Sequence, residues 1–426
     1  MSRLHQFGRA KTRRVPMFAS ALAGMLLLAA CGGNAEGDTD QVSGEGFAYG
    51  ADQSEVNEVI ADLEPVTLSY QSPASSEDHV LAQSTIQFRD YVEERSNGQI
   101  SLDITWGTAV AGYGEVDDAL LDGRLDLAYT LPVYDTSSYP MYDALSSLSV
   151  YAPSTPFAGE AASYAMMSTL AWENEDVLDE FESKGLRVLS PMINTGQYGT
   201  WCSEPSDDLS AFDGSTISIS TAANSEIIQS LGGTPVNLEW LETYEALERN
   251  TVRCTMINQP VSASSGVTEV APHMVFAQSG SPSKASGSHV AGSSFEELPL
   301  AYQQIIFDSE VVAFDGWLQH IENAIVANAE SGAEFIPFND EAQAAVDEAH
   351  EKVVQQHIEN GTITEEHVER AKELADIWSD HATELGFEDE GTLGDFDEWY
   401  NPEEVDFEPL GEKLMTETFL DHRPGA

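Results

Sequence analysis

The chain has 426 residues, and its 73 acidic residues against 18 basic ones give a formal net charge of −55. Hydrophobic residues make up 42% of the chain, which is enough for a sizeable core and excludes wholesale disorder. The negative field repels polyanions, so nucleic-acid binding and adhesion to an anionic membrane surface are excluded as the main activity. The acidic excess is spread along the chain, as expected of a solvated surface or of adaptation to a salty or alkaline habitat.

The first 31 residues have the composition of an export signal. Basic residues without an acidic one precede an apolar run from Val15 to Ala30, which is too short for a confident membrane-spanning helix. The run ends in Leu-Ala-Ala-Cys at 28–31, which resembles the bacterial lipobox, whose cysteine is acylated and becomes the mature N-terminus. We therefore predict a lipoprotein signal peptide at 1–31 with lipidation of Cys31. An ordinary cleaved signal with an incidental cysteine is the alternative.

Residues 32–56 are rich in Gly, Ser, Asp and Glu and predict a flexible tether. No later apolar stretch reaches about 18 residues, the length that a spanning helix needs. The sequence thus predicts a globular body held by a lipid anchor on the outer face of the cell membrane, in the periplasm or at the cell surface.

Two cysteines remain after Cys31, namely Cys202 and Cys254. In an exported protein, two thiols are more often paired than free. We predict a disulfide between them, with two separately buried thiols as the alternative.

Alternating strand-like and helical patterns predict an α/β body. Short β-rich runs at 66–70, 100–104 and 125–129 are separated by helical patterns that begin near Leu81 and Glu115. Strands that alternate with helices form parallel crossovers in one sheet.

A second series of strands and helices is expected between residues 216 and 257. The Ser- and Gly-rich segment 278–292 predicts a loop or a return crossing, and residues 298–330 predict one long helical region. Helical patterns return at 340–386, and the acidic end at 387–426 is expected to be irregular.

Candidate ligand-binding residues follow from this pattern. In parallel sheets the ligand crevice lies beyond the carboxyl ends of the strands, which points to Ser72, Trp106 and Tyr129. Tyr198 and Trp201 are candidate pocket walls, because binding clefts combine aromatic walls with few polar groups. Packing in the core is the alternative role for each aromatic residue.

The sequence predicts no catalytic residue, metal site or cofactor. His350, Glu351 and His357 have the wrong spacing for a zinc-protease helix, and there is no G-x-S-x-G elbow or phosphate-binding loop. An exported α/β hydrolase and an adhesive surface lipoprotein are alternative functions. The first lacks a nucleophile motif, and the second lacks repeats.

Four short motifs point to a family. They are F-x-x-Y-V-E-E-x-S-x-G at 88–98, L-L-D-G-R-L-D-L-A at 120–128, L-G-G-T-P at 231–235 and E-T-Y-E-A-L at 242–247. In their order and spacing they resemble the solute-binding proteins of the tripartite, ATP-independent (TRAP) transporters, the DctP-like family. Members with cysteines at the positions of Cys202 and Cys254 form a subgroup, which agrees with the predicted disulfide.

The resemblance implies a two-lobed, periplasmic-binding-protein-like α/β fold with a long interlobe helix. We expect lobe 1 at 57–195 with a return segment at about 277–312, lobe 2 at 196–276 with about 313–345, and an acidic helical C-terminal extension at 346–426. The implied function is an extracytoplasmic receptor, not an enzyme. It would capture a small polar or organic-acid ligand and deliver it to the small and large integral TRAP membrane subunits.

One departure from the family pattern concerns the ligand. Family members usually carry an arginine that forks onto a ligand carboxylate, and Ser218 stands at that position here. Arg253, ahead of Cys254, replaces an acidic residue of the family and is the alternative partner for a ligand carboxylate. We therefore expect Ser218 to face the cleft near Asn258, and a ligand that is neutral, zwitterionic or hydroxylated rather than a simple dicarboxylate.

Overall fold

The computed structural model describes residues 45–426 except Ser220 and Glu239. The predicted signal peptide, Cys31 and residues 32–44 of the expected tether lie outside the described residues. In the part of the chain that is described, no helix is long and apolar enough to cross a bilayer.

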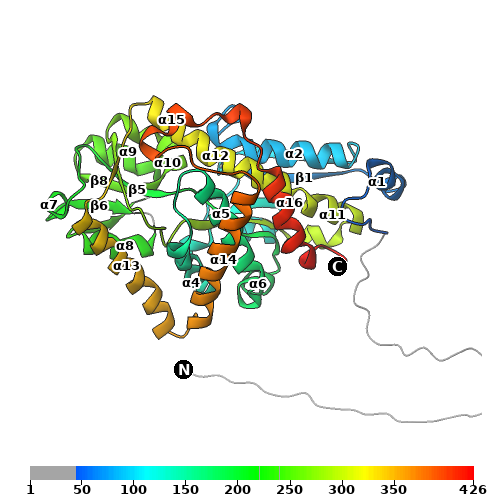
Figure 1. Cartoon of the computed structure of the whole chain (residues 1–426). Coiled ribbons are helices and arrows are strands. Elements are labelled where there is room, and N and C mark those ends of the chain that lie inside the picture. Colours follow the sequence, from blue (N-terminus) through cyan, green and yellow to red (C-terminus); the bar gives the residue numbers. More distant parts are fainter. Residues whose placement is uncertain (1–44, 220, 239) are drawn as a thin grey trace, which may run out of the picture. The chain divides into compact units, whose positions relative to one another are not determined.

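The first lobe is built on a five-stranded sheet of order β2-β1-β3-β10-β4 (Figure 1). Its strands are β1 (Val66–Ser72), β2 (Ile100–Trp106), β3 (Leu127–Thr130), β4 (Arg187–Asn194) and β10 (Ala285–Ala291). The strand β1 pairs in parallel with β2 and β3, as the crossover pattern predicts, whereas β10 runs antiparallel to β3 and β4.

The segment expected as a loop or return crossing therefore contains a fully buried strand, β10. Its small residues are required by close packing. A Cβ added at Gly287 would lie 2.4 Å from the hydroxyl oxygen of Tyr129 on the neighbouring strand. Composition alone made this strand resemble a loop, because Ser and Gly are depleted in most strands.

The second lobe is built on a six-stranded sheet of order β11-β9-β5-β8-β6-β7. Its strands are β5 (Tyr198–Cys202), β6 (Thr216–Ile219), β7 (Thr234–Asn237), β8 (Cys254–Asn258), β9 (His273–Phe276) and β11 (Glu334–Pro337). The strand β5 is antiparallel to both neighbours, and its register places Cys202 opposite Cys254. The predicted disulfide is confirmed, with Cα atoms 4.2 Å apart.

The chain passes between the lobes at two neighbouring points, from β4 to β5 and from β9 to β10, and it returns to the second lobe before β11. The two crossing segments bind each other, since the Thr195 backbone N–H donates to the Lys284 carbonyl at 2.8 Å and the Thr195 hydroxyl lies 3.1 Å from that of Ser286. The Lys284 ammonium forms an ion pair of 3.0 Å with Glu160, and both side chains are only 1% exposed. Strands β5 to β9 are thus inserted between β4 and β10.

Helices cover both sheets. The helices of the first lobe are α1 (Gln53–Ile60), α2 (Gln83–Arg95), α3 (Val116–Leu121), α4 (Pro140–Ser147), α5 (Ala158–Trp172) and α6 (Glu175–Glu182). Those of the second are α7 (Leu209–Phe212), α8 (Ala222–Ser230), α9 (Trp240–Glu248) and α10 (Gln259–Ser265).

The predicted long helix is two helices, α11 (Leu300–Asp308) and α12 (Glu310–Glu330). They meet at Ser309, whose hydroxyl donates to the Ile306 carbonyl and competes with the helical hydrogen bonds. The helix α12 contacts α2 of the first lobe and α10 of the second, so it spans both (Figure 1).

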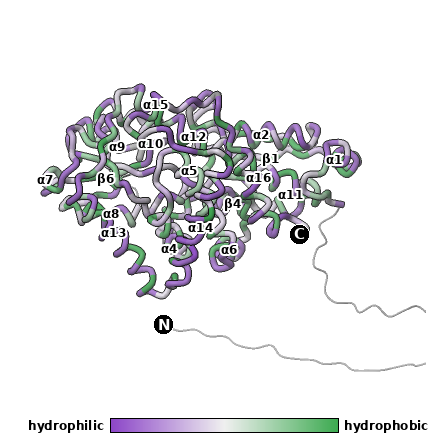
Figure 2. The backbone as a smooth tube through the Cα atoms, in the orientation of Figure 1, coloured by the Kyte–Doolittle hydropathy of each residue, from purple (hydrophilic) through white to green (hydrophobic). Residues whose placement is uncertain are grey.

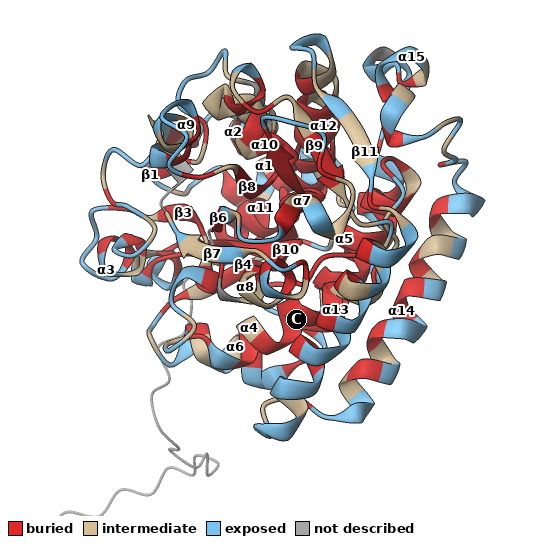
Figure 3. Ribbon diagram, turned by 90° about the vertical axis from the view of Figure 1, so that its left-hand side faces the viewer, coloured by how far each residue is buried: buried red, intermediate tan, exposed pale blue. Residues whose placement is uncertain are grey.

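The C-terminal extension is more regular than predicted. It contains α13 (Asp340–Glu359), α14 (Glu365–Glu384), α15 (Phe396–Trp399) and α16 (Glu408–Glu417), so the expectation that 387–426 is irregular is wrong. Hydrophilic and hydrophobic residues alternate along α13 (Figure 2), and the outward side of α14 is exposed (Figure 3). Buried apolar residues such as Phe396 and Phe407 hold the acidic segment on the body.

The described part of the expected tether, residues 45–56, packs on the body. Phe47 is buried, its backbone N–H donates to Gln304 at 2.8 Å, and its carbonyl accepts from Arg423. The side chain of Asp52 then caps α1. One buried aromatic residue thus fixes a segment whose composition is otherwise that of a linker.

The disulfide gives the first testable prediction. The Cys202→Ser/Cys254→Ser variant should unfold at lower denaturant concentration, with about 4 kcal/mol lost from the free energy of unfolding, because the bridge closes a loop of 52 residues in the unfolded chain. Denaturant titration of the exported protein and the variant measures this. Equal stability, or labelling of both thiols in the denatured but unreduced protein, would contradict the bridge.

Candidate ligand-binding site

A cavity of about 340 Å³ is lined by residues of both lobes. On the first lobe it lies beyond the carboxyl ends of β1 and β3, in contact with Pro73 and Leu131. On the second it borders the end of β8 and the helix α10. The volume is in the range of small-molecule sites, and the position is where the topology of an open α/β sheet places a ligand.

The first wall of the cavity is a continuous row of aromatic rings. Tyr134 and Tyr129 both contact Tyr113 edge-on, with ring centroids 6.1 and 6.2 Å away. Tyr129 lies 4.7 Å from Trp317, and Trp317 lies 5.1 Å from His320 one turn further along α12. Two strand-end loops and the interlobe helix therefore build one surface.

The opposite wall comes from the second lobe. Tyr198 on β5 and Tyr244 on α9 line it, together with Ile257 and Val261. The Oδ1 atom of Asn258 accepts from the Val261 backbone N–H at 3.0 Å and thereby caps α10. Asn258 is also one of the polar residues of the cavity lining.

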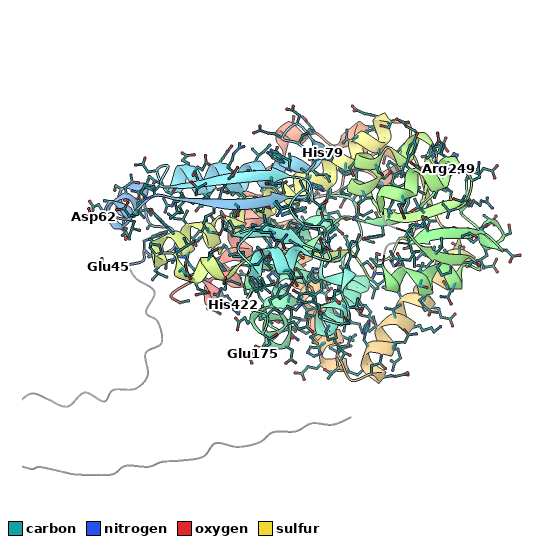
Figure 4. All side chains as sticks on the ribbon, turned by 180° about the vertical axis from the view of Figure 1, so that it is seen from behind. Glu45, Asp62, His79, Glu175, Arg249 and His422 are labelled. Atoms are coloured by element: carbon teal, nitrogen blue, oxygen red, sulfur yellow. A yellow bond between two sulfur atoms is a disulfide. The ribbon has the colours of Figure 1, made fainter. Side chains whose placement is uncertain are left out.

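The lining carries no Asp, Glu, Lys or Arg among the described residues. Its ionisable groups are tyrosines and two histidines. Burial lowers the pKa of His79, whose Nδ1 accepts from the Leu81 backbone N–H at 3.2 Å, and Figure 4 shows His79 at the junction of the two lobes. Burial lowers the pKa of His320 to about 3, and the Nδ1 atom of this ring has no hydrogen-bond partner. Burial also raises the pKa of Tyr129 far above its usual value.

Three of the residues predicted from the sequence, Tyr129, Tyr198 and Asn258, line this cavity. Ser72 does not, because its buried hydroxyl is bonded to that of Thr85 at 2.8 Å. Trp106 on β2 pairs with Ser72 on β1 and also lies outside the lining.

Trp201 and Ser218 are buried elsewhere in the second lobe. Side chains alternate along a strand, so Trp201 faces away from Tyr198 on β5, and its indole N–H donates to the Ile257 carbonyl at 3.3 Å. Ser218 is 1% exposed on β6, and its hydroxyl has no hydrogen-bond partner. Arg253 does not replace the missing arginine, because it donates to the Ala211 carbonyl at the far end of β8.

Several lining residues were not predicted. Tyr113, Tyr134 and Tyr244 come from loops and a helix, where position relative to the cavity has no local sequence signal. Trp317 and His320 lie on the apolar helix α12, where they resemble ordinary core residues. A weak signal existed for Tyr113, an aromatic residue between two glycines that follows a predicted strand.

Two lobes around a shared cavity define a ligand-binding receptor. Residues 72–360 match the bacterial extracellular solute-binding proteins of family 7, DctP. Because this match covers more than half of the chain, the chain belongs to that family. The chain is therefore an extracytoplasmic receptor for a small solute. No curated protein matches it.

Solved structures of TRAP solute-binding proteins share the fold. The benzoate-bound protein of Rhodoferax ferrireducens superposes with a TM-score of 0.62 at 19% identity, over 74% of this chain and 99% of that chain. The ectoine-binding protein of the Halomonas elongata TeaABC TRAP transporter gives 0.55 at 20% identity, over 75% and 100%. A galacturonate-bound protein of a Sulfitobacter species gives 0.59 at 15% identity, over 72% and 100%. The predicted two-lobed α/β fold is confirmed.

The buried imidazole of His320 predicts an acid sensitivity. The unfolded chain binds a proton at this ring below about pH 6.5, whereas the folded protein, with a pKa of about 3, does not, so stability falls as pH falls. His320→Gln should reduce the loss of unfolding free energy between about pH 7.5 and pH 5 by about 2 kcal/mol. Denaturant titration at both pH values measures it. Ser286→Ala, also at the cavity, should keep the wild-type loss, and an unchanged loss in His320→Gln would refute the assignment.

Proposed function

We propose that this receptor captures its solute in the cavity between the aromatic walls and delivers it to TRAP-type membrane subunits for uptake. The observation that carries the proposal is the shared lining, with Tyr129 and Trp317 on one side and Tyr198 and Asn258 on the other. A solute that touches both walls binds best when the lobes are together. Ligand binding therefore favours the closed arrangement, which the membrane subunits distinguish from an empty receptor.

The relatives named above are a benzoate-bound, an ectoine-binding and a galacturonate-bound protein, and these three solutes differ in charge and shape. The shared fold thus accepts several kinds of solute, and the lining residues select among them. In this chain the lining is aromatic, hydroxylated and without a fixed charge among the described residues, which favours a compact solute that needs no arginine partner.

We further propose that Cys31 carries the lipid that holds the receptor at the membrane. The lipobox-like sequence at 28–31 supports this, as does the glycine- and acid-rich stretch before Phe47. A tethered receptor stays close to its membrane subunits, which raises its effective concentration there.

The receptor function can be tested by a thermal-shift screen of the purified mature protein against small acids, sugars, polyols, amines and compatible solutes. A true ligand raises the melting temperature by an amount that grows with the logarithm of its concentration above its Kd, because it binds only the folded state. The shift should be lost in Tyr198→Ala and retained in Trp399→Leu, a variant outside the cavity. A screen in which no solute of any class produces a cavity-dependent shift would overturn the function.

The anchor has its own test. Cys31→Ser should move the protein from the membrane fraction to the soluble extracytoplasmic fraction, because stable anchoring requires acyl chains on that cysteine. Fractionation followed by high-salt and carbonate washes measures this. Retention of the variant in the washed membranes would show that another segment holds the protein.

A further inference from the structure

The positions of the lysine and arginine residues limit the charge that a ligand in the cavity can carry. Every lysine and arginine within the described residues has a protein partner away from the cavity. Lys284, the basic residue in the crossing segment next to the cavity residue Ser286, is paired with Glu160 and donates to the Pro153 carbonyl. The two cavity histidines do not supply a cation either, because burial lowers the pKa of each. A carboxylate that entered this cavity would lose its hydration without gaining an ionic partner, which is costly.

The aromatic rings of the cavity favour a positively charged ligand. The faces of tyrosine and tryptophan rings carry negative potential and attract cations within about 6 Å, most strongly where water is excluded. Six such rings, from Tyr113, Tyr129, Tyr134, Tyr198, Tyr244 and Trp317, line the cavity on both sides. The hydroxyl of Tyr244 donates to the Glu269 carboxylate at 3.3 Å, which places a negative charge behind one of the rings.

One polar atom of the lining, Nδ1 of His320, is a hydrogen-bond acceptor without a donor. The hydrogen bond between His320 and the Leu81 backbone favours the protonated ring, which means that the ring is the donor. Because Nδ1 has no partner, we assign the donated proton to Nε2, and Nδ1 of the neutral ring then carries a lone pair. This side chain is only 4% exposed, and a buried acceptor without a donor is unfavourable. Nδ1 is closed to solvent, so a ligand O–H or N–H group satisfies it once the ring or its neighbours move.

From these observations we infer that the solute of this receptor is a compact organic cation with at least one hydrogen-bond donor, bound between the tyrosine rings and Trp317 with His320 as acceptor. The inference rests on the proposed receptor function and specifies its ligand. The net charge of −55 acts in the same direction, because it raises the local concentration of cations and repels anions.

Three probes of nearly equal shape separate charge from size. Choline is a cation with a hydroxyl group, 3,3-dimethylbutan-1-ol is its uncharged isostere, and 3,3-dimethylbutanoate is an anion of similar size. Calorimetry with the mature protein should show binding of choline, at least about tenfold weaker binding of the alcohol and no binding of the anion. Glycine betaine, which adds a carboxylate to the trimethylammonium group, should bind more weakly than choline.

Substitutions of the wall test whether the rings are responsible. Trp317→Phe keeps a ring and should weaken choline severalfold, whereas Trp317→Leu removes the ring and should weaken it at least about tenfold. Both should change binding of the uncharged alcohol much less, which separates loss of the ring from general damage. Tyr113→Leu is the second variant should Trp317→Leu not fold, and Trp399→Leu, outside the cavity, should leave choline binding unchanged.

Several results would overturn the inference. They are absence of choline binding, equal binding of choline and its uncharged isostere, tighter binding of betaine or of the anion, and equal losses for choline and the alcohol in Trp317→Leu. A carboxylate found as a cavity-dependent ligand would refute the cationic class and leave the receptor function intact. The receptor function itself falls only if the broad screen yields no ligand.

Discussion

The arrangement depends on two passages of the chain between the lobes, which leave and rejoin the first sheet at its neighbouring strands β4 and β10. Five of the six strands of the second sheet, β5 to β9, are inserted between β4 and β10, so both crossing segments emerge side by side and bind each other through Thr195 and Lys284. The ion pair between Lys284 and Glu160 is almost completely buried, and desolvation raises the pKa of Glu160. A buried charge without its partner is strongly unfavourable, so this pair fixes the position at which the second crossing joins the first lobe.

The helices after the second lobe add connections that the two crossings alone do not provide. The helix α13 contacts both lobes, through an ion pair between Lys352 and Glu226 on α8 and through His357, whose Nε2 lies 3.9 Å from a carboxylate oxygen of Asp143 on α4. The end of the chain is held on the first lobe, where the Arg423 guanidinium donates to both carboxylate oxygens of Asp308. The family match ends at residue 360, so α14 to α16 lie beyond it. These helices limit the ways in which the lobes can separate.

The cavity lining and the surface differ in their charge. The surface is strongly acidic, and the basic residues of the described chain are taken up by ion pairs and backbone carbonyls. The cavity lining excludes both signs of fixed charge and relies on rings, hydroxyl groups and neutral imidazoles. In a protein with so large a negative field, a neutral aromatic cavity admits cations and neutral molecules at low cost, whereas an anion requires a local cation.

The sequence by itself determined the α/β class, the cysteine pair and the family, because these depend on local periodicity, cysteine number and short motifs. It also indicated Tyr129 and Asn258, which lie at the ends of predicted strands, and Tyr198, which was a candidate aromatic wall. It did not reveal β10, because Ser and Gly have a low strand propensity. The strand carries them because its neighbour Tyr129 leaves no room for a larger side chain at Gly287. Only the tertiary structure decided that Trp201 and Ser218 are buried and that Trp317 and His320 line the cavity. Which side of a strand or helix meets the other lobe depends on contacts between residues far apart in the chain, and no local pattern records those contacts.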